Sequence, residues 1–251
     1  MPTQFVKFPK ISVITPVLNS HPTLQACLNS VATQTYPNLE HIIIDGGSTD
    51  GSVAIIEKNS ANLSYWNSKK DGGISDAFNQ GLQQATGDYL YFLGASDALY
   101  HPNTFTTLLE AVPPNTLLVC GRVIRTDEQT NQPLSIAPQK HPKHYNRWGL
   151  LKCLNLPHQG LLMHRAYFDC YGLFDTTLKY AMDYELILRS FHHKPTVILK
   201  NTLVATWRAG GLGKNKLSDV LDEYHAIKCR HHLAPWPILW LINKVIRRNL
   251  P

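Results

Sequence analysis

Short apolar runs recur along the first half of the chain at regular intervals. They are continuous rather than alternating, are rich in β-branched and aromatic residues, and end at Pro, Gly or Asp. Such runs are typical of strands that are buried on both faces of a sheet. We therefore predict strands at residues 11–16, 41–45, 63–66 and 88–94.

The segments between these runs have the periodicity of helices. Apolar residues recur three and four positions apart, as on one face of an α-helix. The clearest examples begin at Leu24, Val53 and Ile74, and Ser48 or Asp50 is a suitable N-cap for the second. Strands that alternate with helices through short connections favour right-handed βαβ units, and hence an α/β fold with a parallel sheet covered on both faces.

Ligands bind at the carboxyl ends of the strands in sheets of this kind. Here these ends carry Thr15-Pro16, Asp45-Gly46-Gly47 and Gly94-Ala95-Ser96-Asp97. We expect the three groups to converge on one cleft.

The pattern is less regular after about residue 120. Residues 125–144 are polar and contain Pro, which predicts a hairpin or a mobile loop. An amphipathic helix is expected around residues 183–189, followed by two β-like runs at 196–200 and 202–207 and a flexible link at 207–213. A charged helix over 215–231 and a mixed aromatic and basic segment at 235–248 follow.

Composition excludes several classes of protein. The 251 residues are 43% apolar and 17% charged, so the chain can bury a sizeable core and is not intrinsically disordered. The five Cys form no C-x-x-C pair, which argues against a disulfide framework or a zinc knuckle. The N-terminus resembles no signal peptide and no run is long enough to cross a bilayer, so we expect a cytoplasmic protein.

The formal net charge of +6 favours anionic partners, such as phosphorylated metabolites, acidic lipid or nucleic acid. No nucleic-acid-binding motif or basic run is recognised, so nucleic acid is not expected as a partner. The segment 235–248 is suited either to the interface of an acidic membrane or to packing on the domain as a terminal helix. In the first case the protein would lie peripherally on the inner face of the cell membrane.

Several acidic residues have two interpretations each. Asp45 either caps the turn after its strand or recognises a base or ribose, with Gly46 allowing close approach of a ligand. The segment 70–81 is typical of a turn into a helix start, where Asp71 and Asp76 either simply cap the helix or accompany backbone N–H groups that bind a phosphate or ribose. Asp97 is suited to Mg²⁺ or Mn²⁺ if phosphate oxygens supply the remaining ligands.

The segment MDYELILR places two acids on one predicted helix. Asp183 and Glu185 are two residues apart and point in different directions, so at most one faces the cleft. The alternative is a solvated helix face with an ion pair between Asp183 and Arg189. His158 and Gln159 lie between the two halves of the chain. They are candidates to touch a substrate, and the alternative for His158 is a packed or surface position.

Four blocks taken together resemble the family 2 glycosyltransferases, which have the GT-A fold. They cover about residues 10–210 in the family's order, and they are closest to small bacterial members of polysaccharide and lipid-linked glycan assembly. The blocks are ITPVLN, SVATQTYPNLEHIIIDGGSTDGS, DGGISDAFNQGLQQATGDYLYFLGASD and DYELILR.

This resemblance implies a Rossmann-like, mostly parallel sheet flanked by helices, with an acceptor-side region and terminal helices after it. The GT-A domain would span residues 1–213, with a nucleotide-sugar half at about 10–122 and an acceptor half at about 123–213. Residues 214–251 would form a C-terminal helical extension.

The resemblance also implies a role for individual residues. Asp183 matches the catalytic base, Asp97 the metal-binding acid, and Gly210 and Gly211 a turn in the loop that closes over the donor. The residues expected around the donor are Pro16, Asn19, Asp45, Gly46, Asp71, Asp76 and Ser96.

The activity implied is an inverting, metal-dependent transfer of a sugar from a UDP-, GDP- or dTDP-sugar to a glycan or lipid-linked acceptor. Two departures from the family pattern are Ser96, where many relatives have a second acid, and Lys69, where relatives often have Glu. The alternatives are a sugar nucleotidyltransferase, although the Gly-rich phosphate loop of that class is absent, and a catalytically degenerate nucleotide-sugar binder.

Overall fold

The structure is a computed structural model, and it describes residues 8–139, 144–151, 154, 156–211 and 216–233. In this part of the chain a single mixed sheet of nine strands forms the centre of the molecule. Its strands are β1 (Ile11–Val17), β2 (Leu39–Asp45), β3 (Tyr65–Ser68), β4 (Tyr89–Phe92), β5 (Ala98–Leu99), β6 (Leu118–Thr126), β7 (Pro133–Ala137), β8 (Leu161–His164) and β9 (Val197–Arg208).

The first four strands are parallel, as their continuous apolar character predicts. The order across the sheet is β3-β2-β1-β4-β8-β6-β9-β5, with β7 paired to β6. Strand β1 lies between β2 and β4. Its last pair with β4 joins Ile14 to Phe92, and Pro16 lies beyond that pair. The missing N–H of Pro16 therefore breaks no bond to β4.

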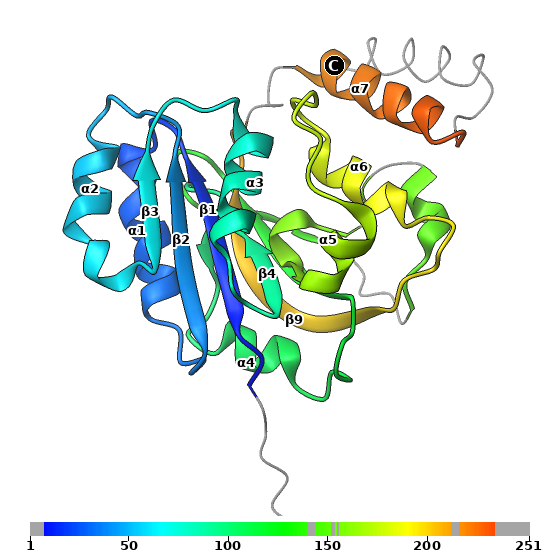
Figure 1. Ribbon diagram of the computed structural model, residues 1–251, viewed down its shortest axis with the longest axis horizontal. Coiled ribbons are helices and arrows are strands. Elements are labelled where there is room, and N and C mark those ends of the chain that lie inside the picture. Colours follow the sequence, from blue (N-terminus) through cyan, green and yellow to red (C-terminus); the bar gives the residue numbers. More distant parts are fainter. Residues whose placement is uncertain (1–7, 140–143, 152–153, 155, 212–215, 234–251) are drawn as a thin grey trace, which may run out of the picture.

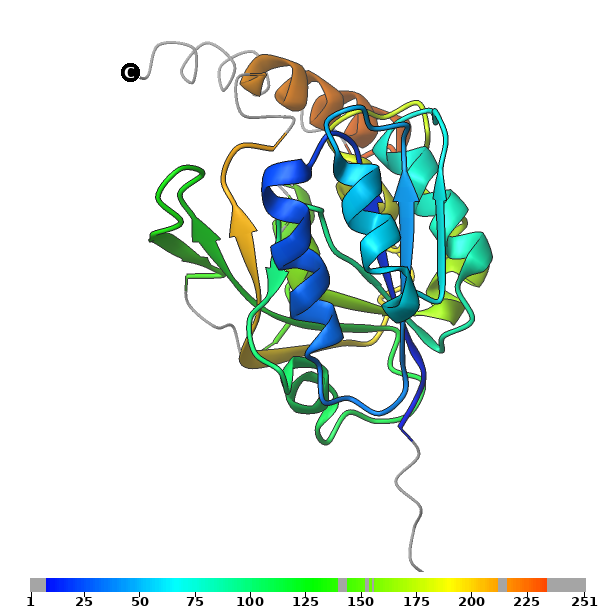
Figure 2. The ribbon, with the colours of Figure 1, turned by 90° about the vertical axis from the view of Figure 1, so that its left-hand side faces the viewer.

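Helices cover both faces of the sheet (Figures 1 and 2). Residues of α1, α2 and α4 pack in the clusters on one face, and residues of α3, α5, α6 and α7 pack in the cluster on the other. The helices are α1 (His21–Ala32), α2 (Ser52–Lys58), α3 (Ile74–Gln84), α4 (Thr104–Leu109), α5 (Arg165–Tyr171), α6 (Met182–Arg189) and α7 (Leu217–Arg230).

The predicted third strand is shifted along the chain, because pairing with β2 begins later than the apolar run does. Residues 60–62 form a short 3₁₀ turn, and the N–H of Leu63 closes it on the carbonyl of Ser60. The first bond to β2 comes from Ser64, and the strand itself is Tyr65–Ser68 rather than 63–66.

The two β-like runs expected at 196–200 and 202–207 are one continuous strand, β9. It pairs in parallel with β6 along both halves, and the register shifts between them. Cys120 pairs with Leu199, Arg122 with Leu203 and Val123 with Ala205, so β9 carries two extra residues at a first shift and one at a second. The polar Asn201, which separates the two runs in the sequence, is exposed at this irregularity.

The region predicted as a hairpin or mobile loop at 125–144 contains an antiparallel hairpin of β6 and β7. The charged helix expected at 215–231 is α7. The segment at 235–248 lies outside the described residues, and no helix within the described part is long and apolar enough to cross a membrane.

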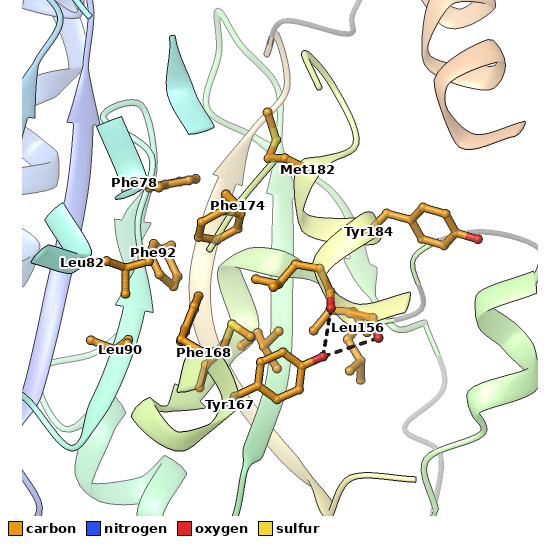
Figure 3. Close-up of a cluster of buried hydrophobic side chains, with 14 of the residues drawn as sticks. Phe78, Leu82, Leu90, Phe92, Leu156, Tyr167, Phe168, Phe174, Met182 and Tyr184 are labelled. Atoms are coloured by element: carbon orange, nitrogen blue, oxygen red, sulfur yellow. Dashed lines mark hydrogen bonds between the residues drawn. The ribbon is translucent and has the colours of Figure 1, made fainter. Parts of the chain in front are cut away.

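The largest buried cluster joins the parallel part of the sheet to the second half of the chain. Four Phe side chains meet at its centre, Phe78 from α3, Phe92 from β4, Phe168 from α5 and Phe174 (Figure 3). The hydroxyl of Tyr167 donates to the carbonyls of Leu186 and Ile187 and fixes α5 against α6. The two halves of the chain therefore share one core.

Candidate active site

Asp45 ends β2 and organises the loop that follows it. Its carboxylate is fully buried and accepts hydrogen bonds from the N–H groups of Gly47 and Ser48 and from the hydroxyls of Ser48 and Ser68. Four accepted bonds match the acceptor capacity of a carboxylate, which is why this charge can be buried. Asp45 therefore caps the turn at Gly47 and Ser48, and its contact with a nucleobase stays a prediction.

The loop after β1 is tied to the loop after β2 at two places. Asn19, at φ 48°, accepts a hydrogen bond from Thr49 N–H and donates its own N–H to Ser48 Oγ. Asp50 accepts from the N–H groups of His21 and Ser52, at the starts of α1 and α2. The N-cap of α2 is Gly51, so neither Ser48 nor Asp50 holds the predicted position, although Asp50 accepts from the first N–H of the helix.

Gly46 lets the loop after β3 approach the end of β2. A Cβ atom at Gly46 would lie 3.0 Å from Oδ2 of Asp71, so the Asp71 carboxylate occupies the space that a side chain would need. Asp71 accepts from Gly73 N–H, and Asp76, in the first turn of α3, accepts from Gly72 N–H and from Gln80. Both acids therefore shape the loop that leads into α3.

Asp97 lies in the turn between β4 and β5. Its side chain is 5% exposed. Oδ1 accepts from Arg208 N–H in β9 at 3.0 Å and Oδ2 from Nε2 of Gln159 at 3.3 Å. Burial raises the pKa of Asp97 to about 7, although these two hydrogen bonds oppose the rise. The neighbouring Ser96 is exposed.

His158 and Gln159 belong to a 3₁₀ turn, η3 (His158–Gly160), that stands between the two halves. Gln159 reaches Asp97, and the ring of His158 packs against Phe78 and Phe92 at centroid distances of 5.6 and 6.0 Å. Burial lowers the pKa of His158, and the nearby Asp183 works against this shift.

Asp183 lies in the first turn of α6, where its Oδ2 is 3.9 Å from Nδ1 of His158. Both side chains line a small pocket with apolar walls, including Leu156, Phe174 and Leu186. Burial raises the pKa of Asp183, and His158 and the N–H of Tyr184 oppose the rise.

Glu185, the other acid of this helix, has a structural role because it makes ion pairs. It is 3% exposed and pairs with Arg189 and with His231, which directly follows α7. The ion pair on this helix is therefore Glu185–Arg189 and not Asp183–Arg189. Asp183 lines the pocket, and the expectation that at most one of the two acids faces the cleft stays a prediction.

Two sets of predicted residues are thus assembled. Asn19, Asp45, Gly46, Asp71 and Asp76 meet through contacts of the loops after β1, β2 and β3. Asp97, Gln159, His158 and Asp183 form a chain of contacts across the two halves. Helix α3 links the sets, because it carries Asp76 in its first turn and packs Phe78 on His158.

Gly210 lies two residues after the end of β9 and against the loop of the β6–β7 hairpin. It has a φ of +135°, and a Cβ there would lie 2.6 Å from Cδ of Glu128. Arg208, two residues earlier, donates its side-chain N–H groups to the carbonyl of Glu128. Gly211 has open space around it, and residues 212–215 lie outside the described part.

Three contributors to these sets were missed by sequence reasoning. Ser68 helps to saturate Asp45, the backbone of Arg208 holds Asp97, and Glu223 binds the segment before α6. Ser68 ends a strand beside Asp45, so its position could have been found from the sequence. The other two contacts depend on long-range pairing that no local pattern shows.

The fold and these sets define the class of protein. A family model described as Glycosyl transferase family 2 matches residues 12–172. The chain therefore belongs to glycosyltransferase family 2 and is a glycosyltransferase, as the four sequence blocks indicated. The family match sets aside the alternative of a sugar nucleotidyltransferase.

Relatives of this class cover most of the chain. A PGL/p-HBAD biosynthesis glycosyltransferase of Mycobacterium bovis is 31% identical over 225 residues, which are 84% of this chain and 81% of that protein. A glycosyltransferase of Rickettsia typhi is 27% identical over 226 residues, or 87% of this chain and 70% of that protein.

Solved structures show the same GT-A fold. Residues 1–349 of S. aureus TarS in complex with UDP superpose with a TM-score of 0.65 at 17% identity, over 87% of this chain and 65% of that one. The mannosyltransferase PcManGT of Pyrobaculum calidifontis, in complex with GDP-Man and Mn²⁺, gives 0.66 at 18% identity, over 92% of this chain and 67% of that one. The chain spans about two thirds of the length of each.

Proposed function

We propose that this glycosyltransferase moves a sugar from a nucleotide-sugar donor to an acceptor hydroxyl and inverts the anomeric configuration. The observation that carries the proposal is the chain of contacts from Asp97 through Gln159 and His158 to Asp183. It connects a carboxylate beside the strand ends, where the diphosphate is expected, with a second carboxylate suited to act as a base.

The donor is proposed to bind over the carboxyl ends of β1, β2 and β3. The loops there are held by Asn19, Asp45 and Asp71, and the start of α3 supplies Asp76. Structural neighbours in complex with UDP and with GDP-Man support a nucleoside diphosphate sugar as the donor class. Pro16 and Gly46 border this region with little side-chain bulk.

A divalent cation, Mg²⁺ or Mn²⁺, fits the donor set at Asp97. Each oxygen of this buried carboxylate accepts one hydrogen bond, so lone pairs are left on both. No group of three or more His, Cys, Asp and Glu suited to a metal occurs in the described residues. Asp97 would then hold the ion together with diphosphate oxygens, a mode that Mg²⁺ commonly adopts. The bound ion would neutralise charge that develops on the leaving diphosphate.

Asp183 is proposed as the general base. It accepts the proton of the acceptor hydroxyl while that oxygen attacks the anomeric carbon from the face opposite the diphosphate. The new C–O bond forms as the bond to the phosphate oxygen breaks, and the diphosphate leaves with the electron pair. One displacement of this kind inverts the configuration. The raised pKa of Asp183 supports this role, because a stronger base removes the proton more readily.

The acceptor is proposed to be a glycan or a lipid-linked molecule. Two observations support this choice: the relative named for PGL/p-HBAD biosynthesis and the aromatic and basic sequence of residues 235–248. That segment would place the protein on the inner face of the cell membrane, in contact with acidic lipid. Binding to acidic vesicles that survives deletion of residues 235–251 would contradict this part of the proposal.

A thermal-shift screen of UDP-, GDP- and dTDP-sugars, with and without Mn²⁺, tests the donor class. We expect stabilisation by one of them, enhanced by Mn²⁺, and slow release of the nucleoside diphosphate, which a degenerate binder would not give. Absence of stabilisation by every donor would refute the proposal.

Substitution Asp183→Asn tests the base. Donor binding should persist while turnover falls by about 10²–10⁴-fold, the usual contribution of general base catalysis. The matched control is Asp169→Asn, which removes an exposed carboxylate of α5. Full activity of Asp183→Asn would remove Asp183 from the mechanism.

A further inference from the structure

One carboxylate of α7 binds three consecutive backbone N–H groups. Glu223 accepts from Lys179 at 2.7 Å through Oε1, and from Tyr180 at 2.7 Å and Ala181 at 2.6 Å through Oε2. These residues directly precede Met182, the first residue of α6. Glu223 therefore holds the segment that leads into the helix of Asp183.

The start of α6 needs such a partner, because its own cap residue supplies none. Ala181 occupies the N-cap position and has no side-chain oxygen. N–H groups at a helix start need acceptors, and a negative charge nearby interacts favourably with the helix dipole. Glu223, which belongs to α7, supplies an acceptor for the N–H of Ala181 and a negative charge near the helix start.

A second contact aligns the two helices. The rings of Tyr184 in α6 and Tyr224 in α7 are stacked, with centroids 4.3 Å apart and an interplanar angle of 23°. The hydroxyl of Tyr184 donates to the carbonyl of Leu150 at 2.7 Å, and its N–H donates to Oδ1 of Asp183. Residues on both sides of Asp183 are thus fixed by contacts with α7 or by the core.

We propose that Glu223 is a positioning residue for the reaction, which acts by fixing residues 179–181 so that Asp183 is presented to the acceptor hydroxyl. This inference rests on the proposed function, since it assigns to α7 a part in placing the base. It predicts that the region after residue 213 is needed for turnover and not for binding of the donor.

The substitution Glu223→Gln tests this role. The amide has one acceptor oxygen in place of two, and its NH₂ group would face backbone donors. The matched control is Asp219→Asn, which removes an exposed carboxylate one turn earlier on α7. Glu223→Asp keeps the charge but shortens the reach, and serves if Glu223→Gln fails to fold.

Two measurements are made on the full chain. Hydrogen exchange of the peptide covering residues 176–182 should accelerate at least tenfold in Glu223→Gln and to a lesser extent in Glu223→Asp. Release of nucleoside diphosphate from the donor selected by the screen should fall at least tenfold in kcat. The Kd for the nucleoside diphosphate with Mn²⁺ should stay within twofold, and Asp219→Asn should match the wild type in all three.

The proposal is overturned if residues 176–182 keep their protection, or if protection is lost while kcat stays within twofold of the wild type. A loss of nucleotide affinity equal to the loss of kcat would also overturn it, because general destabilisation would then explain the effect. Absence of any turnover in the wild type would refute the proposed function instead. The exchange measurement needs no substrate and would still test the contact.

Discussion

At the residue scale, three aspartates of the candidate site show how surroundings give one side chain different properties. Asp45 accepts four hydrogen bonds and holds its loop. Asp97 accepts two and is buried, with its pKa raised to about 7. Asp183 faces a pocket with apolar walls beside His158. Asp97 and Asp183 accept fewer hydrogen bonds than Asp45, so their oxygens keep more lone pairs for chemistry or a cation.

A buried histidine of β2, which faces β1, makes the free energy of unfolding depend on pH. His41 is 5% exposed, and its Nε2 lies 3.0 Å from Oγ1 of Thr15. Burial lowers the pKa of His41 to about 3, so the folded protein keeps this ring neutral when the unfolded chain protonates it near its ordinary pKa of 6.5. The contribution of His41 to stability is therefore complete above pH 6.5 and is lost progressively as the pH falls toward 3.

We expect His41→Gln, which does not titrate, to lack this contribution to the pH dependence. The difference in unfolding free energy between wild type and variant should change by up to about 1.4 kcal/mol per pH unit below pH 6.5. Urea denaturation at pH 7.5, 6.5, 5.5 and 5.0 measures it. A difference that is constant over this range would show that His41 is not neutral in the folded state.

At the element scale, α3 approaches β1 closely. Gly81 permits it, since a Cβ there would lie 2.3 Å from Cγ2 of Ile14. This contact places the start of α3, with Asp76, beside the ends of the parallel strands. Ile74, Phe78 and Leu82 complete the packing of the helix on the sheet.

The substitution Gly81→Ala has two opposed effects on the free energy of unfolding. Helix propensity gains about 1 kcal/mol, but overpacking against β1 costs about 1–3 kcal/mol, and at this distance we expect a net loss of about 1–2 kcal/mol. Chemical denaturation measures the loss. Gln83→Ala, on the exposed side of α3, should change stability by less than about 0.5 kcal/mol. A Gly81→Ala variant as stable as the wild type would show that the helix can move away without cost.

Elements with a strong local pattern were predicted correctly from the sequence. Strands β1 and β2 and helices α3 and α7 lie close to the predicted positions, because apolar periodicity and breaker residues determine them. The continuity of β9 was not predicted, since it depends on pairing with β6, a partner far away in the sequence. Strand β5, with two residues, has no local signal at all.

At the scale of the whole molecule, α7 is part of the same core as the sheet. Ile227 is fully buried in the largest cluster, Arg230 pairs with Asp175, and His231 pairs with Glu185. The boundary predicted near residue 213 stays a prediction. The contacts of α7 nevertheless indicate that the helix unfolds together with the domain.

Substitution Ile227→Ala tests this cooperativity. Removing a buried Ile side chain should cost about 2–5 kcal/mol of global stability, and unfolding should stay a single transition by circular dichroism and Trp fluorescence. Leu217→Ala, at an exposed position of the same helix, is the control. Two separate transitions, with only the first one shifted, would mean that α7 is a unit of its own.

The candidate site was predictable to the extent that its residues end strands or begin helices. Asp45, Asp97 and Asp183 occupy such positions, and the family resemblance assigned their roles. The partners that hold these acids were not predictable. The Arg208 N–H and the Glu223 carboxylate come from elements far away in the sequence. The position of a backbone N–H group also cannot be predicted from the pattern of side chains.

The position of Glu223 in the chain has a consequence for biosynthesis. A ribosome completes all strands of the sheet before it adds Glu223, so residues 179–181 lack this acceptor until α7 is made. At about 5–20 residues per second, the delay between Ala181 and Glu223 is on the order of seconds. During that interval the segment before α6 is held by the core alone, and its last hydrogen bonds form only when α7 docks.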